Sequence, residues 1–418
     1  MTAVHPADPA DDPTDPDPAD PATAAGTGAS TGTGAGDLAA DASEAGPLAG
    51  LLVIDLTRVL AGPFATMIMA DLGARVIKVE HPATGDDSRR YGPFAADGRS
   101  MYFARVNRGK QSLAVDLKKN PEQVAALAER ADVLVENFRP GVMDRLGLGP
   151  AQLRARNPRL VYASVSGYGA TGPRSGEPAY DAVIQARSGL MSVTGEPDGP
   201  PVKAGASVSD LSAGVYTFGA VMAALVGRGI HGRGTHVDIS MFDATVSFLE
   251  GNALAWLADR TVPHRIGSHH PNIAPFGAFA AADGQIVVCV GNDALFAAFA
   301  AALGAPELAG RPEFAENGAR SANRVVLTAV IEELLAADTC AGWLARLEAA
   351  KVPCAPVNDI GQAMTDPQTE ARRMRITAGG LELPGQVVKM DGYPDPLRRP
   401  GAPGLDEHGD VIRAEFGL

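Results

Sequence analysis

Short apolar segments alternate with helical segments from residue 51 onward, and this alternation constrains the fold most. Residues 51–56 have the composition of a buried strand, residues 64–72 have helical spacing that ends at Gly73, and residues 75–80 form a second apolar segment. Short connections between a strand, a helix and a second strand favour a parallel pair. The sequence therefore predicts a β-α-β unit at the start of the ordered chain.

The same pattern recurs further along the chain. It predicts strands at 112–116, 133–136, 160–165 and 236–240, and helices at 122–130, 152–156, 211–226 and 243–258. Repeated alternation of this kind predicts an α/β, doubly wound core of Rossmann-like type. The turn at 57–63 has one glycine and no GxGxxG motif, so it does not favour a nicotinamide or flavin site.

Changes in composition divide the chain into three parts. Residues 1–46 are rich in Ala, Pro, Asp and Gly and lack hydrophobic periodicity, which predicts a disordered tail. Residues 262–345 contain a hairpin-like turn at 282–284 and helical segments at 294–303 and 323–336, which predicts a smaller second domain. We assign residues 47–261 and 346–418 to the large domain.

Charge and cysteine content exclude several classes of protein. The first 50 residues contain nine acids and no Lys or Arg, so the rest of the chain carries only −4 of the formal charge of −13. There is no basic stripe with interleaved aromatics, and we expect no nucleic-acid partner. Three widely spaced cysteines suggest neither a metal site nor a disulfide framework. Without a signal peptide or an uninterrupted apolar run of about 18 residues, we expect a cytoplasmic protein with no membrane partner.

Asp210 is the residue with the most chemical promise. It lies in a run of small residues, 204–214, that leads into the long apolar segment at 211–226. An acid here is typical of a helix cap, where the positive end of the dipole keeps a carboxylate ionised. Small neighbours would let a ligand approach closely, but this environment alone supports only a capping role.

Several motifs in order resemble one family, the class III CoA transferases, which includes formyl-CoA and carnitine CoA transferases and the α-methylacyl-CoA racemases. The resemblance spans residues 48–418. It is carried by DLTRVLAGP at 55–63, LGARVIKVE at 72–80, NRGKQS at 107–112, VENFRPG at 135–141, SGYG at 166–169, AYDA at 179–182, TGEPDGPP at 194–201 and GRGTH at 232–236.

The resemblance implies a nucleophilic role for Asp210, through an aspartyl anhydride and an aspartyl-CoA thioester. It also implies an interlocked, ring-like homodimer. Coenzyme A would be a substrate, with no tightly bound cofactor. The implied CoA contacts are Leu60, Ala61, Val115, Lys118, Asn137, Phe138, Arg139, Arg145, Tyr180 and Asp181. Lys118 and Arg145 suit phosphates but are also ordinary surface charges, Asn137 is also typical of a turn, and Asp181 of a helix cap.

Two positions favour CoA transfer over racemisation. Racemases of this family have a histidine where this chain has Tyr180 and a glutamate where it has Ala280, so the acid/base pair is missing. A racemase or a catalytically silent CoA-binding protein remain the alternatives.

The loop 267–272 bears on the choice of substrate. It has fewer glycines than the formyl-CoA transferase loop, which puts oxalate and formyl specificity in doubt and favours succinyl-CoA with a dicarboxylate. His269 and His270 are candidate contacts for a second carboxylate, and ordinary loop histidines are the alternative. We expect small carboxylic acids and acyl-CoA as the substrates.

Overall fold

A six-stranded sheet forms the centre of the computed structural model. The structure describes residues 46–418, so the predicted tail of residues 1–46 lies outside the described residues, except for Gly46. All neighbouring strands are parallel, in the order β3-β2-β1-β4-β5-β6. The strands are β1 (Leu52–Asp55), β2 (Arg75–Glu80), β3 (Gln111–Ala114), β4 (Val133–Glu136), β5 (Val161–Ser166) and β6 (His236–Ser240). The predicted parallel α/β sheet is therefore confirmed.

Both faces of this sheet are buried, because alternate residues of each strand enter different cores. Ile54 and Leu134 belong to one core, with helices α3 (Pro121–Arg130), α5 (Pro150–Arg156) and α16 (Gly409–Phe416). Val53 and Val133 belong to the other, with α1 (Ala61–Asp71), α7 (Val208–His231) and α8 (Met241–Ser247). Burial on both faces explains why the strands read as continuous apolar runs.

The strand order reverses beside β1, which pairs with β2 on one side and β4 on the other. The chain leaves β1 towards α1 on one face, whereas it leaves β4 towards α4 (Val142–Arg145) and α5. A crevice at the carboxyl ends of the strands is the usual ligand site where such loops diverge. The motifs that follow β1 and β4 therefore lie at this position.

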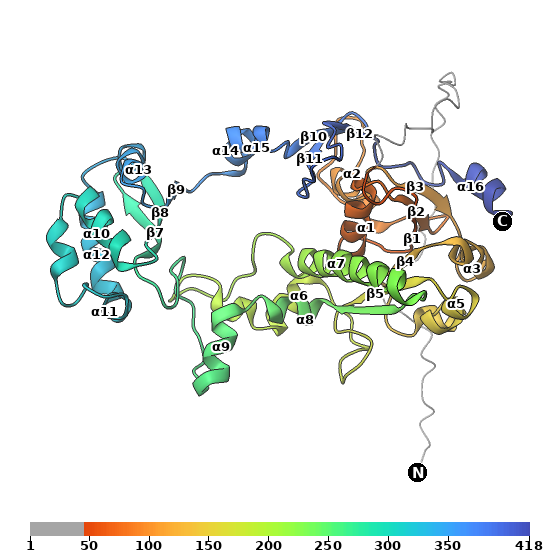
Figure 1. The fold of residues 1–418 in the computed structure, drawn as a ribbon, viewed down its shortest axis with the longest axis horizontal. Helices are drawn as coiled ribbons and strands as arrows, with labels where there is room; N and C mark the ends of the chain where they lie inside the picture. Colours follow the sequence, from red (N-terminus) through yellow and green to blue (C-terminus); the bar gives the residue numbers. More distant parts are fainter. Residues whose placement is uncertain (1–45) are drawn as a thin grey trace, which may run out of the picture. The chain divides into compact units, whose positions relative to one another are not determined.

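A second sheet consists of β7 (Phe276–Ala281), β8 (Gly284–Cys289) and β9 (Cys354–Pro356), all antiparallel (Figure 1). The predicted hairpin is confirmed, since Ala281 and Gly284 face each other across its two-residue turn. The sheet shares an apolar core with α10 (Asp293–Ala302), α12 (Arg324–Leu335) and α13 (Cys340–Ala349). This core includes Val352, and β9 pairs with β8. The segment therefore extends the small sheet to Pro356, eleven residues beyond residue 345, where the predicted small domain ends. The division into two domains stays a prediction.

The C-terminal segment packs on the region around β2 and β3. A third sheet of β10 (Arg375–Ala378), β11 (Leu381–Pro384) and β12 (Arg398–Arg399) packs against α2 (Met101–Asn107). The remaining short helices are α6 (Asp181–Arg187), α11 (Asn317–Ala322), α14 (Ile360–Thr365) and α15 (Pro367–Ala371), with 3₁₀ turns at Asp87–Arg90, Leu190–Val193 and Pro306–Gly310.

Two helices differ from the sequence-based expectation. The single helix predicted at 243–258 is two helices, α8 and α9 (Glu250–Asp259), because Glu250 has a positive φ of 45° and breaks the helical path. Helix α7 begins before Leu211 and has 24 residues, long and apolar enough to span a membrane by length and composition. Long core helices meet the same criteria, and α7 packs against α1 and α8.

Candidate active site

The first turn of α7 carries Asp210, but Asp210 does not cap the helix. Ser207 is the N-cap residue and makes no side-chain capping bond. The acceptor comes from another helix: Oδ1 of Asp181 accepts hydrogen bonds from the backbone N–H of Ser209 at 2.9 Å and of Asp210 at 3.4 Å. The expected capping role of Asp210 is therefore wrong, and its carboxylate is left for other contacts.

The capping carboxylate is itself held in place. Asp181 is buried, and its Oδ2 accepts a 2.6 Å bond from Nε2 of the fully buried Gln185, one turn further along α6. Oε1 of Gln185 accepts from the backbone N–H of Ala204 at 2.9 Å. Gln185 thus links α6 to the chain segment that enters α7, so the position of Asp210 depends on two helices.

The environment of Asp210 raises its pKa to about 7, so the expectation that the helix end keeps this carboxylate ionised is also wrong. Removal of the half-buried carboxylate from water is the main cause, and the charge of Asp181 is the second. A more basic carboxylate is a stronger nucleophile once it is ionised. Perturbed carboxylates of this kind cluster at functional sites.

Tyr102 of α2 faces the same region, and the sequence analysis did not select it. Burial, together with the charge of Asp210, raises the pKa of its hydroxyl to about 12. Its ring contacts Tyr91 edge to face, with centroids 5.8 Å apart. A hydroxyl that keeps its proton in this region can donate a hydrogen bond to negative charge near Asp210. No local motif marks Tyr102, because only packing brings α2 towards Asp210.

Close packing of α1 on α7 brings the loop after β1 close to Asp210. Gly214 follows Asp210 by one helical turn and so lies on the same face of α7. A Cβ at Gly214 would lie 2.7 Å from the carbonyl oxygen of Ala61, so only glycine allows this approach. The structure therefore brings the predicted contact Ala61, and Leu60 before it, next to the first turns of α7; both side chains are buried, which leaves their backbone for contact with a ligand.

The other predicted CoA contacts follow the carboxyl ends of β3 and β4 or lie near the start of α6. Val115 is buried after β3, whereas Lys118 is exposed. Phe138 packs partly on the core, and Arg139 and Arg145 are exposed. Tyr180, the N-cap residue of α6, is 66% exposed and next to the capping residue Asp181. The exposed cations and Tyr180 are accessible to a ligand, whereas Val115 offers backbone only.

His269 and His270 pack on phenylalanines of β7. The ring of His269 contacts Phe279 and that of His270 contacts Phe276, with centroids 5.6 Å and 5.2 Å apart. Burial lowers the pKa of His269. Gly277 allows this contact, since a Cβ there would lie 2.7 Å from Nδ1 of His269. These contacts anchor the loop to the small sheet, and the proposed carboxylate contact stays a prediction.

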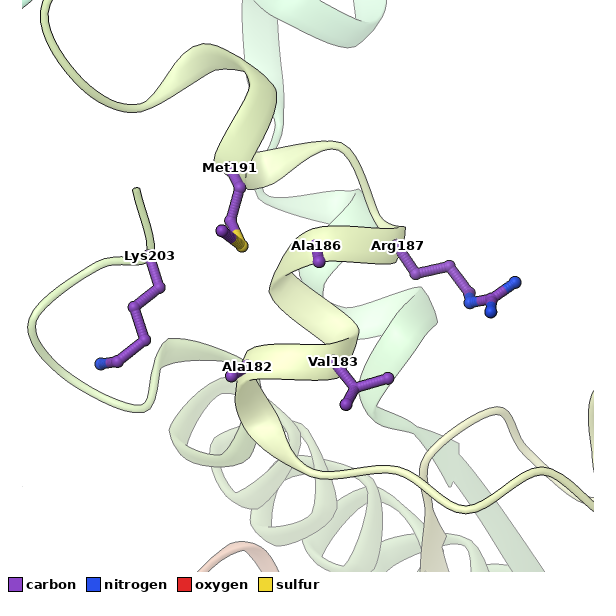
Figure 2. Close-up of a pocket in the computed structure, with 6 residues that line it drawn as sticks. All are labelled: Ala182, Val183, Ala186, Arg187, Met191 and Lys203. Atoms are coloured by element: carbon purple, nitrogen blue, oxygen red, sulfur yellow. The ribbon is translucent and has the colours of Figure 1, made fainter. Parts of the chain in front are cut away.

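A cavity of about 600 Å³ lies on α6 and is separate from Asp210. Figure 2 shows its lining from α6, the following 3₁₀ turn and the segment before α7: Ala182, Val183, Ala186, Arg187, Met191 and Lys203. Asp181 and Gln185, which hold the start of α7, are buried on α6 and do not line it. We therefore do not assign the acyl site to this cavity.

Buried polar groups support the carboxyl ends of the strands. Glu136, at the end of β4, has its pKa raised to about 7 by burial and accepts a hydrogen bond from Ser164. Ser164 in turn contacts Nε2 of His236 at 3.0 Å. Among residues 46–418, no group of three or more His, Cys, Asp or Glu side chains has the arrangement of a metal site.

Comparison with known proteins identifies the family. A parallel α/β sheet, with a half-buried aspartate of raised pKa in the first turn of α7, is the arrangement of a candidate acyl-transfer enzyme. The model of CoA-transferase family III matches residues 48–409, so the chain belongs to this family. Members use CoA thioesters as substrates, and the chain is accordingly a CoA-transferase.

Individual relatives support the same assignment. The chain is 51% identical to acetyl-CoA:oxalate CoA-transferase of Acetobacter aceti, over 90% of this chain and 97% of that protein. It is 37% identical to human succinyl-CoA:glutarate CoA-transferase, over 93% and 90% of the two chains. The crystal structure of a CAIB/BAIF family protein from Brucella suis matches with a TM-score of 0.79 and 40% identity, over 89% of this chain and all of that one. Relatives are thus named as acyl-CoA:carboxylate CoA-transferases.

Proposed function

We propose that this enzyme moves CoA between small carboxylic acids through a covalent intermediate on Asp210. The observation that carries the proposal is the placement of Asp210: a half-buried carboxylate in the first turn of α7, with its backbone held by Asp181 and the loop after β1 one turn away. A carboxylate freed from capping and made more basic by burial suits nucleophilic catalysis.

The chemistry has four balanced steps. The Asp210 carboxylate attacks the thioester carbonyl, and the C–S bond breaks to give a mixed anhydride and CoA thiolate. The thiolate attacks the aspartyl carbonyl, which forms an aspartyl-CoA thioester and releases the donor acid. An acceptor carboxylate then displaces the thiolate and forms a second anhydride, and attack of the thiolate on the acceptor carbonyl regenerates Asp210. Exclusion of water protects the anhydrides from hydrolysis.

The acceptor is proposed to be a dicarboxylate, with succinyl-CoA or a similar thioester as the donor. Relatives named for glutarate and mesaconate support this proposal. The low glycine content of the loop 267–272 argued against oxalate as a substrate. The relative named for oxalate, at 51% identity, argues in favour of oxalate. Oxalate therefore belongs in the test panel, as does acetyl-CoA. His269 and His270 are proposed contacts for the second carboxylate.

CoA is proposed to bind at the carboxyl edge of a Rossmann-like sheet. The order β3-β2-β1-β4-β5-β6 supports this description. The loops after β1, β3 and β4 supply the proposed contacts, with Lys118 and Arg145 as phosphate partners. A cytoplasmic location is also proposed, on the sequence evidence.

A homodimer, interlocked as in the family, is the proposed assembly. It is supported by apolar side chains that the single chain leaves exposed on α7 and α9. Among these are Val215, Tyr216, Val226, Ile230, Leu254, Trp256 and Leu257, which are 43–72% exposed. An apolar surface of this kind is typical of an interface. Light scattering that gives a stable monomer would contradict the dimer.

A donor–acceptor matrix tests the function. Succinyl-CoA and acetyl-CoA are each incubated with oxalate, glutarate, mesaconate and malate, and new CoA esters are measured by mass spectrometry. Hydroxylamine added with the donor should label the peptide that contains Asp210. Full transfer by Asp210→Ala would refute the mechanism. Incorporation of solvent deuterium at the α-carbon of a 2-methylacyl-CoA, without transfer, would favour the racemase instead.

A further inference from the structure

We propose that Asn137 and Asp86 are positioning residues that clamp the turn after β1 and hold Val59 in a left-handed backbone conformation. The clamp would fix the backbone at Leu60 and Ala61 that meets CoA, so the inference rests on the proposed function. In this proposal the Asn137 side chain affects CoA binding through the backbone of Arg58, and not by direct contact with CoA.

Val59 has the unusual backbone that the clamp must maintain. Its φ is 68°, in the left-handed region that β-branched residues rarely enter. Such a conformation persists only where surrounding contacts overdetermine it, and it often marks a functional site. The turn lies where the strand order reverses, beside both β2 and β4.

The side-chain amide of Asn137 makes two hydrogen bonds to the backbone of Arg58, the residue before Val59. Oδ1 of Asn137 accepts a 2.8 Å hydrogen bond from the backbone N–H of Arg58, and Nδ2 donates a 2.8 Å bond to the carbonyl of Arg58. Asn137 follows β4, whereas Arg58 follows β1. The paired bonds therefore join the two loops that diverge at the crevice.

Asp86 binds Val59 itself. Its Oδ1 and Oδ2 lie 3.1 and 3.3 Å from the backbone nitrogen of Val59 and accept from its N–H. Lys78 fixes this carboxylate, with Nζ 2.9 Å from Oδ2 of Asp86, and donates a 2.8 Å bond to the carbonyl of Thr57. Lys78 and Asp86 are both buried, so the pair is strongly held.

The conformation of Val59 sets the course of the chain into α1. Ala61 is the first residue of α1, and its carbonyl packs against Gly214, one turn from Asp210. If Val59 relaxed to an extended conformation, Leu60 and Ala61 would move relative to Asp210. We therefore expect loss of the clamp to weaken CoA binding more than the chemical step.

The test is a double-mutant cycle of Asn137→Ala and Val59→Gly, read as KM for the acyl-CoA and kcat. Asn137→Ala should raise KM about tenfold, the effect of losing one to two hydrogen bonds, with kcat changed less than about threefold. Glycine enters the left-handed region without penalty, so in the Val59→Gly background the same substitution should raise KM only about threefold or less.

Asn157→Ala is the matched control. Asn157 also joins backbone segments through its amide, with 2.9 Å bonds to the carbonyls of Ala128 and Ala131, but it precedes β5 and so lies at the amino ends of the strands, away from the crevice. It should leave KM unchanged. If Asn137→Ala does not fold, Asn137→Asp keeps the acceptor for the Arg58 N–H, loses the donor, and should raise KM by a smaller factor.

The outcomes separate the clamp from the proposed function. An equal rise of KM in both backgrounds indicates a direct CoA contact and overturns the clamp, as does an equal effect of Asn157→Ala. Unchanged KM in Asn137→Ala and Asn137→Asp overturns it as well, while the function stands. If wild-type enzyme neither transfers CoA nor binds it by calorimetry, the proposed function fails and the clamp fails with it as a CoA device.

Discussion

Asp181→Asn should shift the pH dependence of the enzyme to lower pH. The substitution removes one negative charge near Asp210 but keeps an oxygen that accepts from the Ser209 N–H. In the proposed mechanism Asp210 must be ionised to attack, so kcat/KM should rise with pH through the raised pKa of about 7 in the wild type. Without the charge of Asp181, ionisation is easier and the rise should occur at lower pH.

The size of the shift follows from the geometry. Oδ1 of Asp181 lies 3.4 Å from the backbone nitrogen of Asp210, so the carboxylates are on the order of 6 Å apart. At an effective dielectric constant of about 20 this gives roughly 3 kcal/mol, and solvent screening of the half-buried Asp210 reduces it to about half. The expected shift is therefore about one pH unit.

The assay is kcat/KM from pH 5 to 9 with one donor–acceptor pair. Asp243→Asn is the control, because Asp243 also lies in the first turn of a helix but is exposed. The control should retain the wild-type profile. A profile of Asp181→Asn that stays within about 0.3 pH unit of wild type, or moves upward, would refute the electrostatic reasoning.

Three further substitutions test other parts of the structure. Asp210→Asn should abolish transfer, yet in urea titrations at pH 8 it should raise the free energy of unfolding by about 1–2 kcal/mol. The reason is that the raised pKa makes the ionised form of Asp210 destabilise the fold above pH 7. The gain in stability should vanish below about pH 4, where the carboxyl group is protonated in both states. An equal gain at both pH values would contradict this origin. Lys78→Met should lower the free energy of unfolding by about 3–5 kcal/mol, because it leaves the buried carboxylate of Asp86 without its ion-pair partner. A loss below about 1 kcal/mol would mean that the Lys78–Asp86 pair is not buried in solution. Gly214→Ala should lower the midpoint of thermal unfolding, at a cost of about 1–3 kcal/mol, because its Cβ would meet a backbone carbonyl of α1. Gly229→Ala is the control, because a Cβ at Gly229 would stand in open space on the same helix, and it should leave the midpoint unchanged. Equal effects of the two substitutions would contradict the close packing of α1 on α7.

Local pattern was sufficient to predict most of the sheet. The apolar runs that became β1, β2 and β4 are short, continuous and separated by helical spacing, so their strand assignment and parallel pairing followed from the chain. The break between α8 and α9 did not, because a single glycine at the break, Gly251, is tolerated inside a helical pattern, and the positive φ falls on Glu250 instead. The extension of the small sheet by β9 was also missed, since a three-residue strand has too little periodicity to read.

The sequence by itself determined the family, the identity of Asp210 as the candidate nucleophile, and the loops that carry the proposed CoA contacts, because these are ordered motifs along one chain. Tertiary structure decided what each side chain does there. Asp181, 29 residues before Asp210, proved to supply the helix cap, and Asn137, 79 residues after Arg58, proved to bind its backbone. Hydrogen bonds form between groups that the fold brings within about 3 Å, whatever their separation in sequence, so such partners emerge only when the chain is folded.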